Sequence, residues 1–508
     1  MKAKMKEPIS TRLWLFLALL PLLAVLQGCP ATVDPPEKDE EAEKIAADPD
    51  YKAKDFLRKE YMDVFYYWRD QVKSRNAGYK PYDYEIYDFF DLLLDSRDHW
   101  SWMCDKEYYV SSETGVYTGT WGVSLAQPTD FGDYGIYIRY IYPGSPLEPF
   151  GVTRGAWLTH INGYDISSID SQEDLDYFNN NYGKSPQKFT FRLADGRDTT
   201  FTATKAASLA TRPGLTTRIF QPGDVPGLTE PVGYFHYLSF LANFLDDIDN
   251  AMKTLHDAGV KKAIIDLRYN GGGDSRASQR LIDYLAPKSA EGKPYVIRHH
   301  NSYLQSQSDS YSDEKNTFSV ISSTRPDDAD SRAAWDKVYP NRLDLDAIYF
   351  ITGSGSASAS EMVMNGMRPF MGDKLQMVGD TTYGKPNGMY VFIYPGSDSD
   401  YDRFYADDFT RLKWVFLPIC FYNMNGNLEP IPDNGFIPNN TRPDDVYHDF
   451  GPQEDLIKAC LTRIATGSYP PVSNVKTKAP GRNGVRMRLE EDEPGYGRYV
   501  ARRPGFSE

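Results

Sequence analysis

A run of small and hydroxyl residues at positions 353–361 (Gly-Ser-Gly-Ser-Ala-Ser-Ala-Ser-Glu) has the composition of a turn that carries a nucleophile. An apolar segment expected to be a strand, 347–352, precedes it, and a segment expected to be helical, 362–367, follows. The first N–H groups of a helix have no acceptor within the helix, so a serine at this junction lies beside free donors. A hydroxyl that attacks a carbonyl carbon while such donors hold the carbonyl oxygen performs acyl transfer. Helix capping and close packing are the alternative interpretation.

Three consecutive glycines, Gly271, Gly272 and Gly273, follow a second apolar segment, 262–267. Glycine allows the backbone to approach a substrate carbonyl closely, so N–H groups here could donate hydrogen bonds to an oxyanion. A flexible turn is the alternative interpretation of these residues.

Lys385 follows Gly384 shortly after a third apolar segment, 376–379. A lysine can act as the base for a serine only in its neutral form, which requires a poorly solvated pocket that disfavours the ammonium. A turn followed by a solvated lysine is the alternative. We expect the glycines, the serine turn and this lysine to meet in one cleft, because each follows a strand of the same α/β region.

Other catalytic chemistries have little support. His236, His299 and His300 have no motif context, and a Gly-x-Ser-x-Gly elbow is absent, which disfavours a Ser-His-Asp hydrolase. The sequence contains no His-Glu-x-x-His or Cys-x-x-Cys spacing, so we expect no metal and no cofactor. The net charge of −15 is spread along the chain without a basic stripe, so we expect no nucleic-acid partner.

The length of 508 residues predicts two or three folded domains plus tails. Helical and aromatic patterning predicts a small helical N-terminal element at 51–111. Alternating strand and helix patterns predict a layered α/β domain at 206–466, within which the polar segment 287–344 is expected to be an irregular lid or insertion. The proline-rich tail, 467–508, is expected to be extended or disordered.

Short β-like runs separated by turn residues fill the segment 112–205. Its motifs are Gly-Ser-Pro-Leu at 144–147, Gly-Val-Thr-Arg-Gly-Ala-Trp-Leu at 151–158 and Ile-Asn-Gly at 161–163. In this order they resemble a PDZ domain, with another small β module as the alternative. The loop of Thr120, Trp121, Gly122 and Val123 matches the one with which PDZ domains bind a peptide's C-terminal carboxylate while the peptide adds as a strand.

Basic residues, an apolar run too short to span a bilayer and a cysteine begin the chain, which predicts a signal peptide at 1–28. The ending Leu-Gln-Gly-Cys resembles a bacterial lipoprotein signal, which implies lipidation of Cys29 and a membrane anchor. A plain signal peptide with an incidental cysteine is the alternative. The acidic segment 29–50 is expected to be a disordered tether. The expected location is the bacterial cell envelope, facing the periplasm or on the outer-membrane surface.

Three further cysteines, Cys104, Cys420 and Cys460, make an odd number that gives no complete disulfide framework. Their spacing leaves open whether Cys420 and Cys460 pair, and buried free thiols are the favoured interpretation.

The order of glycine run, serine turn and Gly-Lys pair, downstream of a PDZ-like domain, resembles the C-terminal processing, or tail-specific, serine peptidases. The resemblance covers about 112–465 and includes Asp-Leu-Arg-x-Asn-Gly-Gly-Gly at 266–273 and Asn-Gly-Phe-Ile-Pro at 434–438. It implies an α/β multidomain protein whose peptidase domain has a crotonase-like fold. It also implies an envelope endopeptidase that captures protein or peptide substrates by their free C-termini. The alternative is a catalytically inactive peptide- or ligand-binding lipoprotein on the same fold.

The resemblance also implies a role for each residue of the site. Ser358 would be the nucleophile that forms the acyl-enzyme, and Lys385 would be its base. The N–H of Ala359, with that of Gly271 or Gly272, would form the oxyanion hole. The other serines of the turn, Ser354, Ser356 and Ser360, would then be packing or capping residues.

The sequence departs from the family pattern around this dyad. The spacing from Ser358 to Lys385 is slightly longer than in bacterial members, which suggests a small insertion near 368–374. Met389 stands where the family often has a glutamine that orients the lysine, and the acidic residue often found after the nucleophile has no clear equivalent near Pro369. These differences leave the dyad intact and alter its surroundings.

Overall fold

The computed structural model describes residues 39–396 and 410–472. The predicted signal peptide, the lipidation site at Cys29 and most of the predicted C-terminal tail lie outside the described residues. The chain divides into two compact units, 1–49 and 50–508. In the first unit, helix α1 (Glu40–Ala47) forms within the segment that we expected to be a disordered tether. The Asp39 carboxylate caps this helix by accepting a hydrogen bond from the N–H of Ala42 at 3.1 Å.

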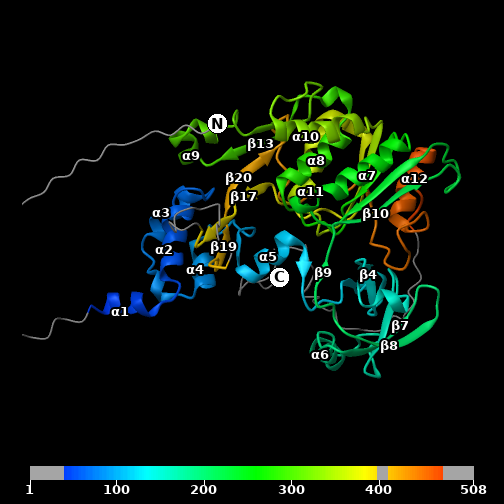
Figure 1. The fold of residues 1–508 in the computed structure, drawn as a ribbon, viewed down its shortest axis with the longest axis horizontal. Helices are drawn as coiled ribbons and strands as arrows, with labels where there is room; N and C mark the ends of the chain where they lie inside the picture. The colour runs from blue at the N-terminus through cyan, green and yellow to red at the C-terminus, as the bar shows by residue number, and fades with distance from the viewer. Residues whose placement is uncertain (1–38, 397–409, 473–508) are drawn as a thin grey trace, which may run out of the picture. The chain divides into compact units, whose positions relative to one another are not determined.

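A six-stranded sheet lies at the centre of the second unit (Figure 1). Its strands, in spatial order, are β10 (Gly214–Phe220), β11 (Val232–Tyr237), β12 (Lys262–Asp266), β15 (Ala347–Thr352), β16 (Leu375–Gly379) and β21 (Asn440–Thr441). Strand β10 pairs antiparallel with β11, and all other neighbours are parallel. Strand β10 lies near the start of the segment 206–466 that we predicted to be the α/β domain.

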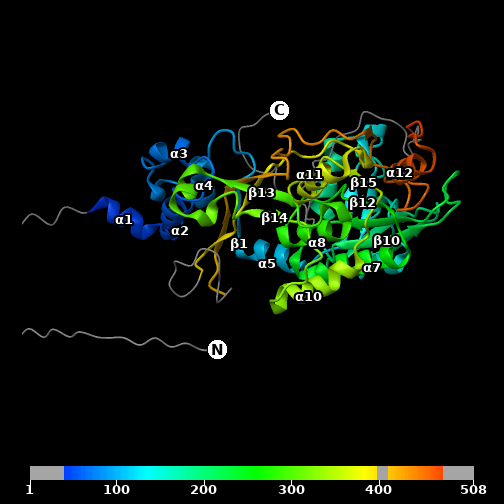
Figure 2. The ribbon, with the colours of Figure 1, turned by 90° about the horizontal axis from the view of Figure 1, so that it is seen from above.

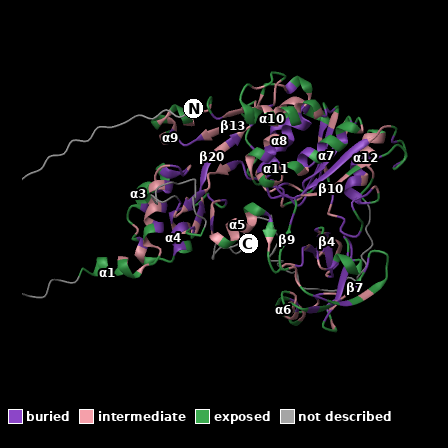
Figure 3. Ribbon diagram, in the orientation of Figure 1, coloured by how far each residue is buried: buried purple, intermediate pink, exposed green. Residues whose placement is uncertain are grey.

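Helices cover both faces of this sheet. Helices α7 (Leu245–Asp257), α8 (Ser275–Leu285) and α11 (Ala359–Met371) share one apolar cluster with it, and α12 (Asp455–Thr466) shares another on the opposite side. Buried residues concentrate on the strands and on the inner sides of α8 and α11 (Figure 3). Because the central strands are apolar on both sides, they require cover on both faces. The predicted layered α/β architecture is therefore confirmed.

The PDZ-like domain forms a separate sheet of antiparallel strands below the α/β layers in Figure 1. Its elements are β3 (Val123–Ala126), β4 (Ile136–Ile141), β5 (Trp157–Ile161), β6 (Tyr164–Asp165), α6 (Gln172–Asn181), β7 (Gln187–Arg192) and β8 (Asp198–Ala203). The strand order is β3-β4-β5-β7-β8, with β6 paired to β5, so β3 lies at an edge. The two-stranded ribbon of β2 (Val116–Tyr117) and β9 (Leu209–Ala210) adjoins it in the sequence.

The N-terminal element contains more than helices. It comprises α2 (Tyr51–Phe56), a π-helical turn (Leu57–Met62), α3 (Arg69–Asn76), α4 (Ile86–Leu93), β1 (Trp102–Asp105) and α5 (Lys106–Thr114). Strand β1 pairs with β19 (Trp414–Leu417), which pairs with β18 (Phe392–Tyr394). The aromatic residues of this element share their core with Phe392, Phe416 and Phe421, so it is built jointly with strands from far along the chain.

The segment 287–344 is more regular than expected. It contains β13 (Pro294–His300), α9 (Ser302–Gln307), β14 (Thr317–Ser319) and α10 (Ala329–Val338). The sheet order β14-β13-β20-β17 includes β20 (Ile419–Met424) and β17 (Asn387–Met389). In the view of Figure 2, β13 and β14 lie between the α2–α4 group and the α8, α11 and α12 group. This segment forms strands because it pairs with strands that are distant in sequence. A local sequence pattern does not predict such pairing.

Short 3₁₀ helices connect the elements: Pro81–Asp83, Thr129–Phe131, Glu148–Phe150, Ala242–Phe244, Lys288–Ala290, Asp309–Tyr311, Tyr339–Asn341 and Gly372–Lys374. Within residues 39–396 and 410–472, no helix has the length and apolarity needed to cross a membrane. Cys104, Cys420 and Cys460 are buried and free.

Candidate active site

Three loops at one edge of the central sheet bring the candidate residues together. Strands β12, β15 and β16 are parallel neighbours, so their carboxyl ends meet at the same edge. The glycine run follows β12, the serine turn follows β15, and Lys385 follows β16. Residues of all three loops, among them Gly271, Gly272, Ser358 and Lys385, line one cavity of about 510 Å³. The sheet topology thus assembles groups that are far apart in the sequence.

The hydroxyl groups of the serine turn differ in their surroundings. The Ser356 hydroxyl donates to the carbonyl of Leu267 at 2.7 Å, and the Ser360 hydroxyl donates to the carbonyl of Asn270 at 2.8 Å. Both hydroxyls therefore fasten the turn to the glycine segment. Ser358 lines the cavity and has a φ of +54°, a region that non-glycine residues rarely adopt. Such strain is typical of side chains held in position for function.

The glycine run lies directly against the serine turn. A Cβ added to Gly272 would lie 2.8 Å from the Cβ of Ser358 and 3.0 Å from the nitrogen of Ala359, and the φ of Gly272 is +107°. Only glycine fits this approach. The N–H of Gly272 already donates to the side-chain oxygen of Asn270 at 2.9 Å. Within the described part of the chain, the N–H groups of Gly271 and Ala359 donate to no other group, which favours Gly271 as the second donor.

Lys385 is buried, with 3% of its surface exposed. Burial lowers the pKa of its ammonium to about 7, although the carboxylates of Asp98 and Glu361 oppose the change. Its Nζ lies 3.7 Å from the Sδ of Met389, the position at which the resemblance anticipates glutamine. A large fraction of Lys385 is therefore neutral near pH 7, which is the state a general base requires.

Glu361 connects the serine turn with the lysine loop. One carboxylate oxygen accepts hydrogen bonds from the Thr382 hydroxyl at 2.6 Å and the Gly384 N–H at 2.8 Å. The other accepts from the N–H of Ser358 at 3.0 Å and that of Lys385 at 2.8 Å. Sequence reasoning gave Glu361 no role, although a serine followed by Glu three residues later is a capping signal. The buried carboxylate fixes the two loops relative to each other.

The variant Glu361→Gln is expected to lower kcat/KM for peptide hydrolysis by about 10- to 100-fold, because small misplacements of catalytic groups have effects of this size. A glutamine supplies one acceptor oxygen, so two of the donors lose their acceptor. Peptide hydrolysis measures the effect, circular dichroism reports folding, and the exposed Glu314→Gln is the matched control. Parental activity in a folded Glu361→Gln variant would show that these bonds do not position the dyad.

The N-terminal element also reaches the lysine loop. The indole N–H of Trp100 donates to the carbonyl of Gly384 at 3.2 Å. Asp98 is fully buried and accepts hydrogen bonds from the hydroxyls of Tyr66 at 2.7 Å and Ser101 at 2.6 Å. Its carboxylate also acts on the pKa of Lys385. Sequence analysis identified neither Trp100 nor Asp98, since no motif connects them to the lysine.

The predicted peptide-binding loop lies outside this cavity, because none of its four residues lines it. Trp121 is buried and its indole N–H donates to the carbonyl of Tyr182 at 2.9 Å. Gly122 has a φ of +64° and its N–H donates to the hydroxyl of Thr120 at 3.0 Å. Val123 begins the edge strand β3. The structure thus places the loop beside a strand edge.

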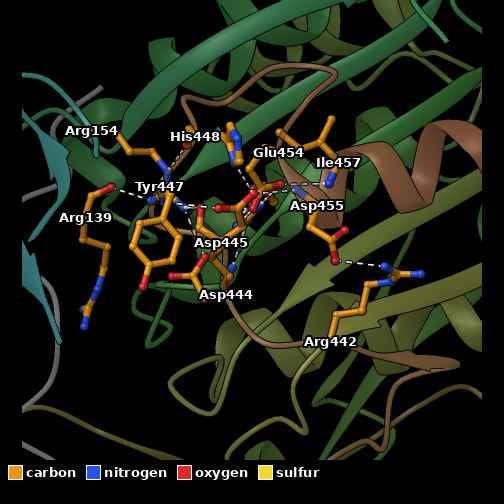
Figure 4. Close-up of polar contacts among 12 residues, drawn as sticks. Arg139, Arg154, Arg442, Asp444, Asp445, Tyr447, His448, Glu454, Asp455 and Ile457 are labelled. Carbon is orange, nitrogen blue, oxygen red and sulfur yellow. Dashed lines mark hydrogen bonds and ion pairs between the residues drawn. The ribbon is translucent and has the colours of Figure 1, made fainter. Parts of the chain in front are cut away.

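Buried charges connect the PDZ-like domain with the α/β domain (Figure 4). Arg154 lies in the 151–158 motif, and its guanidinium donates to Asp444 at 3.1 Å and to the carbonyl of His448 at 2.9 Å. Asp444 also accepts from Arg268 at 2.9 Å, and both arginines are 2% exposed. Arg268 lies in the loop that carries the glycine run. The network therefore joins the PDZ-like domain to the loop that carries the candidate oxyanion donors.

The histidines and possible metal ligands are located elsewhere. His236, His299 and His300 do not line the cavity, so they supply no base to Ser358. Burial lowers the pKa of His236 to about 4. In the described ranges, no group of three or more His, Cys, Asp or Glu side chains has the arrangement to hold a metal ion.

Comparisons with known proteins agree with this geometry. Residues 231–399 match the model of peptidase family S41. A protein of Bacteroides fragilis NCTC 9343 assigned to the S41 proteases shares the fold, with 20% identity, a TM-score of 0.58, and coverage of 81% of this chain and 97% of that chain. The photosystem II D1 C-terminal processing protease matches with 15% identity and a TM-score of 0.41 over 80% of this chain and 93% of that chain. No curated protein matches the sequence. The family match confirms the resemblance to the C-terminal processing peptidases.

Proposed function

We propose that this chain is a serine endopeptidase of family S41 that uses Ser358 as nucleophile and Lys385 as general base. The observation that carries the proposal is the burial of Lys385, with a pKa of about 7, in the cavity that also contains Ser358. An exposed lysine has a pKa near 10.4 and would be protonated at neutral pH. The unengaged N–H groups of Ala359 and Gly271 support the assignment of an oxyanion hole.

In the proposed reaction, the neutral Nζ of Lys385 takes the hydroxyl proton of Ser358 as Oγ bonds to the scissile carbonyl carbon. The carbonyl oxygen becomes an oxyanion that accepts hydrogen bonds from Ala359 and Gly271. The Lys385 ammonium then gives its proton to the leaving nitrogen as the C–N bond breaks, which leaves an ester on Ser358. Water, deprotonated by the same amine, hydrolyses the ester and restores the enzyme.

Substrate capture is assigned to the PDZ-like domain. A peptide would add as a strand to β3, and its terminal carboxylate would approach the loop of Thr120, Trp121, Gly122 and Val123. The edge position of β3 supports this mode of binding. We further propose that lipid on Cys29 anchors the protein in the cell envelope, which fractionation of membranes from cells producing the full chain would check.

A purified mature chain is expected to hydrolyse peptides with an apolar, free C-terminus and to bind them at least about tenfold more tightly than their C-terminal amides, because the amide removes the charge that the loop would bind. Mass spectrometry of the products and binding titrations measure the two effects. The control is a scrambled peptide with the same C-terminal residues. Equal affinity for acid and amide would contradict carboxylate capture, and binding without any cleavage would favour the inactive peptide-binding alternative.

A further inference from the structure

Arg298 is a half-buried cation in the wall of the cavity that contains Ser358 and Lys385. It lies on β13, and its side chain is one of the groups that line the cavity with Ser358 and Lys385. Its guanidinium carbon lies 4.5 Å from the centre of the Phe318 ring and 4.8 Å from that of Phe421. These contacts hold the guanidinium against aromatic surface without using its N–H donors.

The side chain of Arg298 forms neither a hydrogen bond nor an ion pair with the part of the chain that the structure describes. Its Nε is buried and has no hydrogen-bond partner. A buried N–H donor that has no acceptor carries a desolvation cost, so such groups in proteins are normally hydrogen-bonded. Burial lowers the pKa of Arg298, but an arginine stays protonated at neutral pH. Arg298 is therefore a charged donor whose partner is not supplied by the described residues.

The neighbouring groups do not supply that partner. The Asp274 carboxylate acts on the charge of Arg298, and it forms its own ion pair with Arg276 at 2.6 Å. Asn423 lies opposite Arg298 in the β13–β20 ladder and also lines the cavity. Its side-chain oxygen is buried and has no hydrogen-bond partner. A cationic and an amide side chain thus remain available to a ligand on the same wall.

We propose that Arg298 binds a carboxylate of the peptide held in the catalytic cavity and makes this peptidase prefer substrates that present one there. The guanidinium matches a carboxylate because its planar N–H groups can donate to both oxygens at once. The Asn423 amide can add a donor through its nitrogen. The carboxylate comes either from an Asp or Glu side chain near the scissile bond or from the free C-terminus. This inference rests on the proposed function, since it assigns specificity to the same cavity.

The test compares kcat/KM for matched peptides that carry Glu or Gln at each position flanking the scissile bond, and for the same peptides with free or amidated C-termini. Hydrogen bonds to a charged group give the parent an expected preference of about 10- to 100-fold for the carboxylate in one arm. The Arg298→Met variant is expected to lose that preference, so that the ratio of kcat/KM for the charged and the neutral peptide falls to about one. The Glu/Gln arm and the acid/amide arm distinguish the two sources.

Matched controls keep the outcomes separate. Arg276 lines the same cavity but is already paired with Asp274, so Arg276→Met should keep the preference. If amidation of the C-terminus weakens cleavage because of the PDZ-like loop, the difference between acid and amide persists in Arg298→Met. If it weakens cleavage because of Arg298, the difference disappears in that variant. Absence of a carboxylate preference in the parent, or its retention in Arg298→Met, would overturn the inference. If the parent does not cleave at all, tighter binding of the charged peptide by the parent than by Arg298→Met still supports the inference, and the proposed function alone fails.

Discussion

Ser358→Ala is expected to lower peptide hydrolysis by at least about 10⁴-fold, because removal of a catalytic serine eliminates the covalent route and leaves only binding and the oxyanion hole. The φ of +54° at Ser358 is a strained backbone conformation, and such strain is concentrated at active sites. The fold should persist, since the variant removes only one partly exposed hydroxyl.

Kinetic assays on peptides that the parent cleaves measure this effect, together with mass spectrometry for an acyl or inhibitor adduct on the serine. The matched control is Ser354→Ala in the same turn, because Ser354 is exposed and outside the cavity. Its rate should equal that of the parent. A Ser358→Ala variant that retains a tenth of the parental rate would refute the nucleophile assignment.

The location of the proposed dyad was predictable because each part of it follows an apolar strand. Ser358 and Lys385 lie just beyond β15 and β16, whose apolar sequences mark them as central parallel strands. Carboxyl ends of adjacent parallel strands meet at one edge, so the sequence order alone brings the two loops together. The strands of the PDZ-like domain could also be predicted from the local sequence, since turn residues such as Asn162 and Gly163 separate them.

The groups that surround the dyad could not be predicted in the same way. Asp98 acts on Lys385 from an element almost three hundred residues earlier in the sequence, about which a local pattern carries no information. Arg298 lies in a polar segment that forms a strand by pairing with β14 and with the distant strand β20. Long-range contacts of this kind override the local strand propensity of a segment. Glu361 was visible as a capping signal, but its bonds to the lysine loop depend on the position of β16.

The absence of glutamine at position 389 changes how the lysine must be held. The Sδ of Met389 contacts Lys385 but is a weak acceptor, so it cannot orient the amine strongly. Two buried carboxylates, Asp98 and Glu361, act on the lysine charge instead. Both favour the ammonium, whereas burial favours the neutral amine. The pKa of Lys385, the proposed base, is thus set by opposing effects, one of which comes from an element outside the predicted peptidase domain.

Lys385→Met is expected to lower hydrolysis by at least about 10³-fold and to stabilise the fold at the same time. Activity falls because the serine loses its base. In the parent, kcat/KM should rise with pH through about 7, as the neutral amine accumulates. The exposed Lys374→Met is the matched control and should retain both the rate and the pH profile.

The gain in stability follows from the lowered pKa of Lys385, about 7 in the folded chain against an ordinary value of 10.5. Below pH 7 both folded and unfolded chains hold the proton, so the folded parent bears the full cost of burying an ammonium. Between pH 7 and 10.5 only the unfolded chain holds it, and the cost declines as pH rises. Lys385→Met should therefore raise the free energy of unfolding by roughly 3–5 kcal/mol below pH 7 and by progressively less above it. Denaturant titrations at pH 6 and pH 9 measure this difference, and a gain that is equal at both pH values would contradict the burial of a titrating lysine.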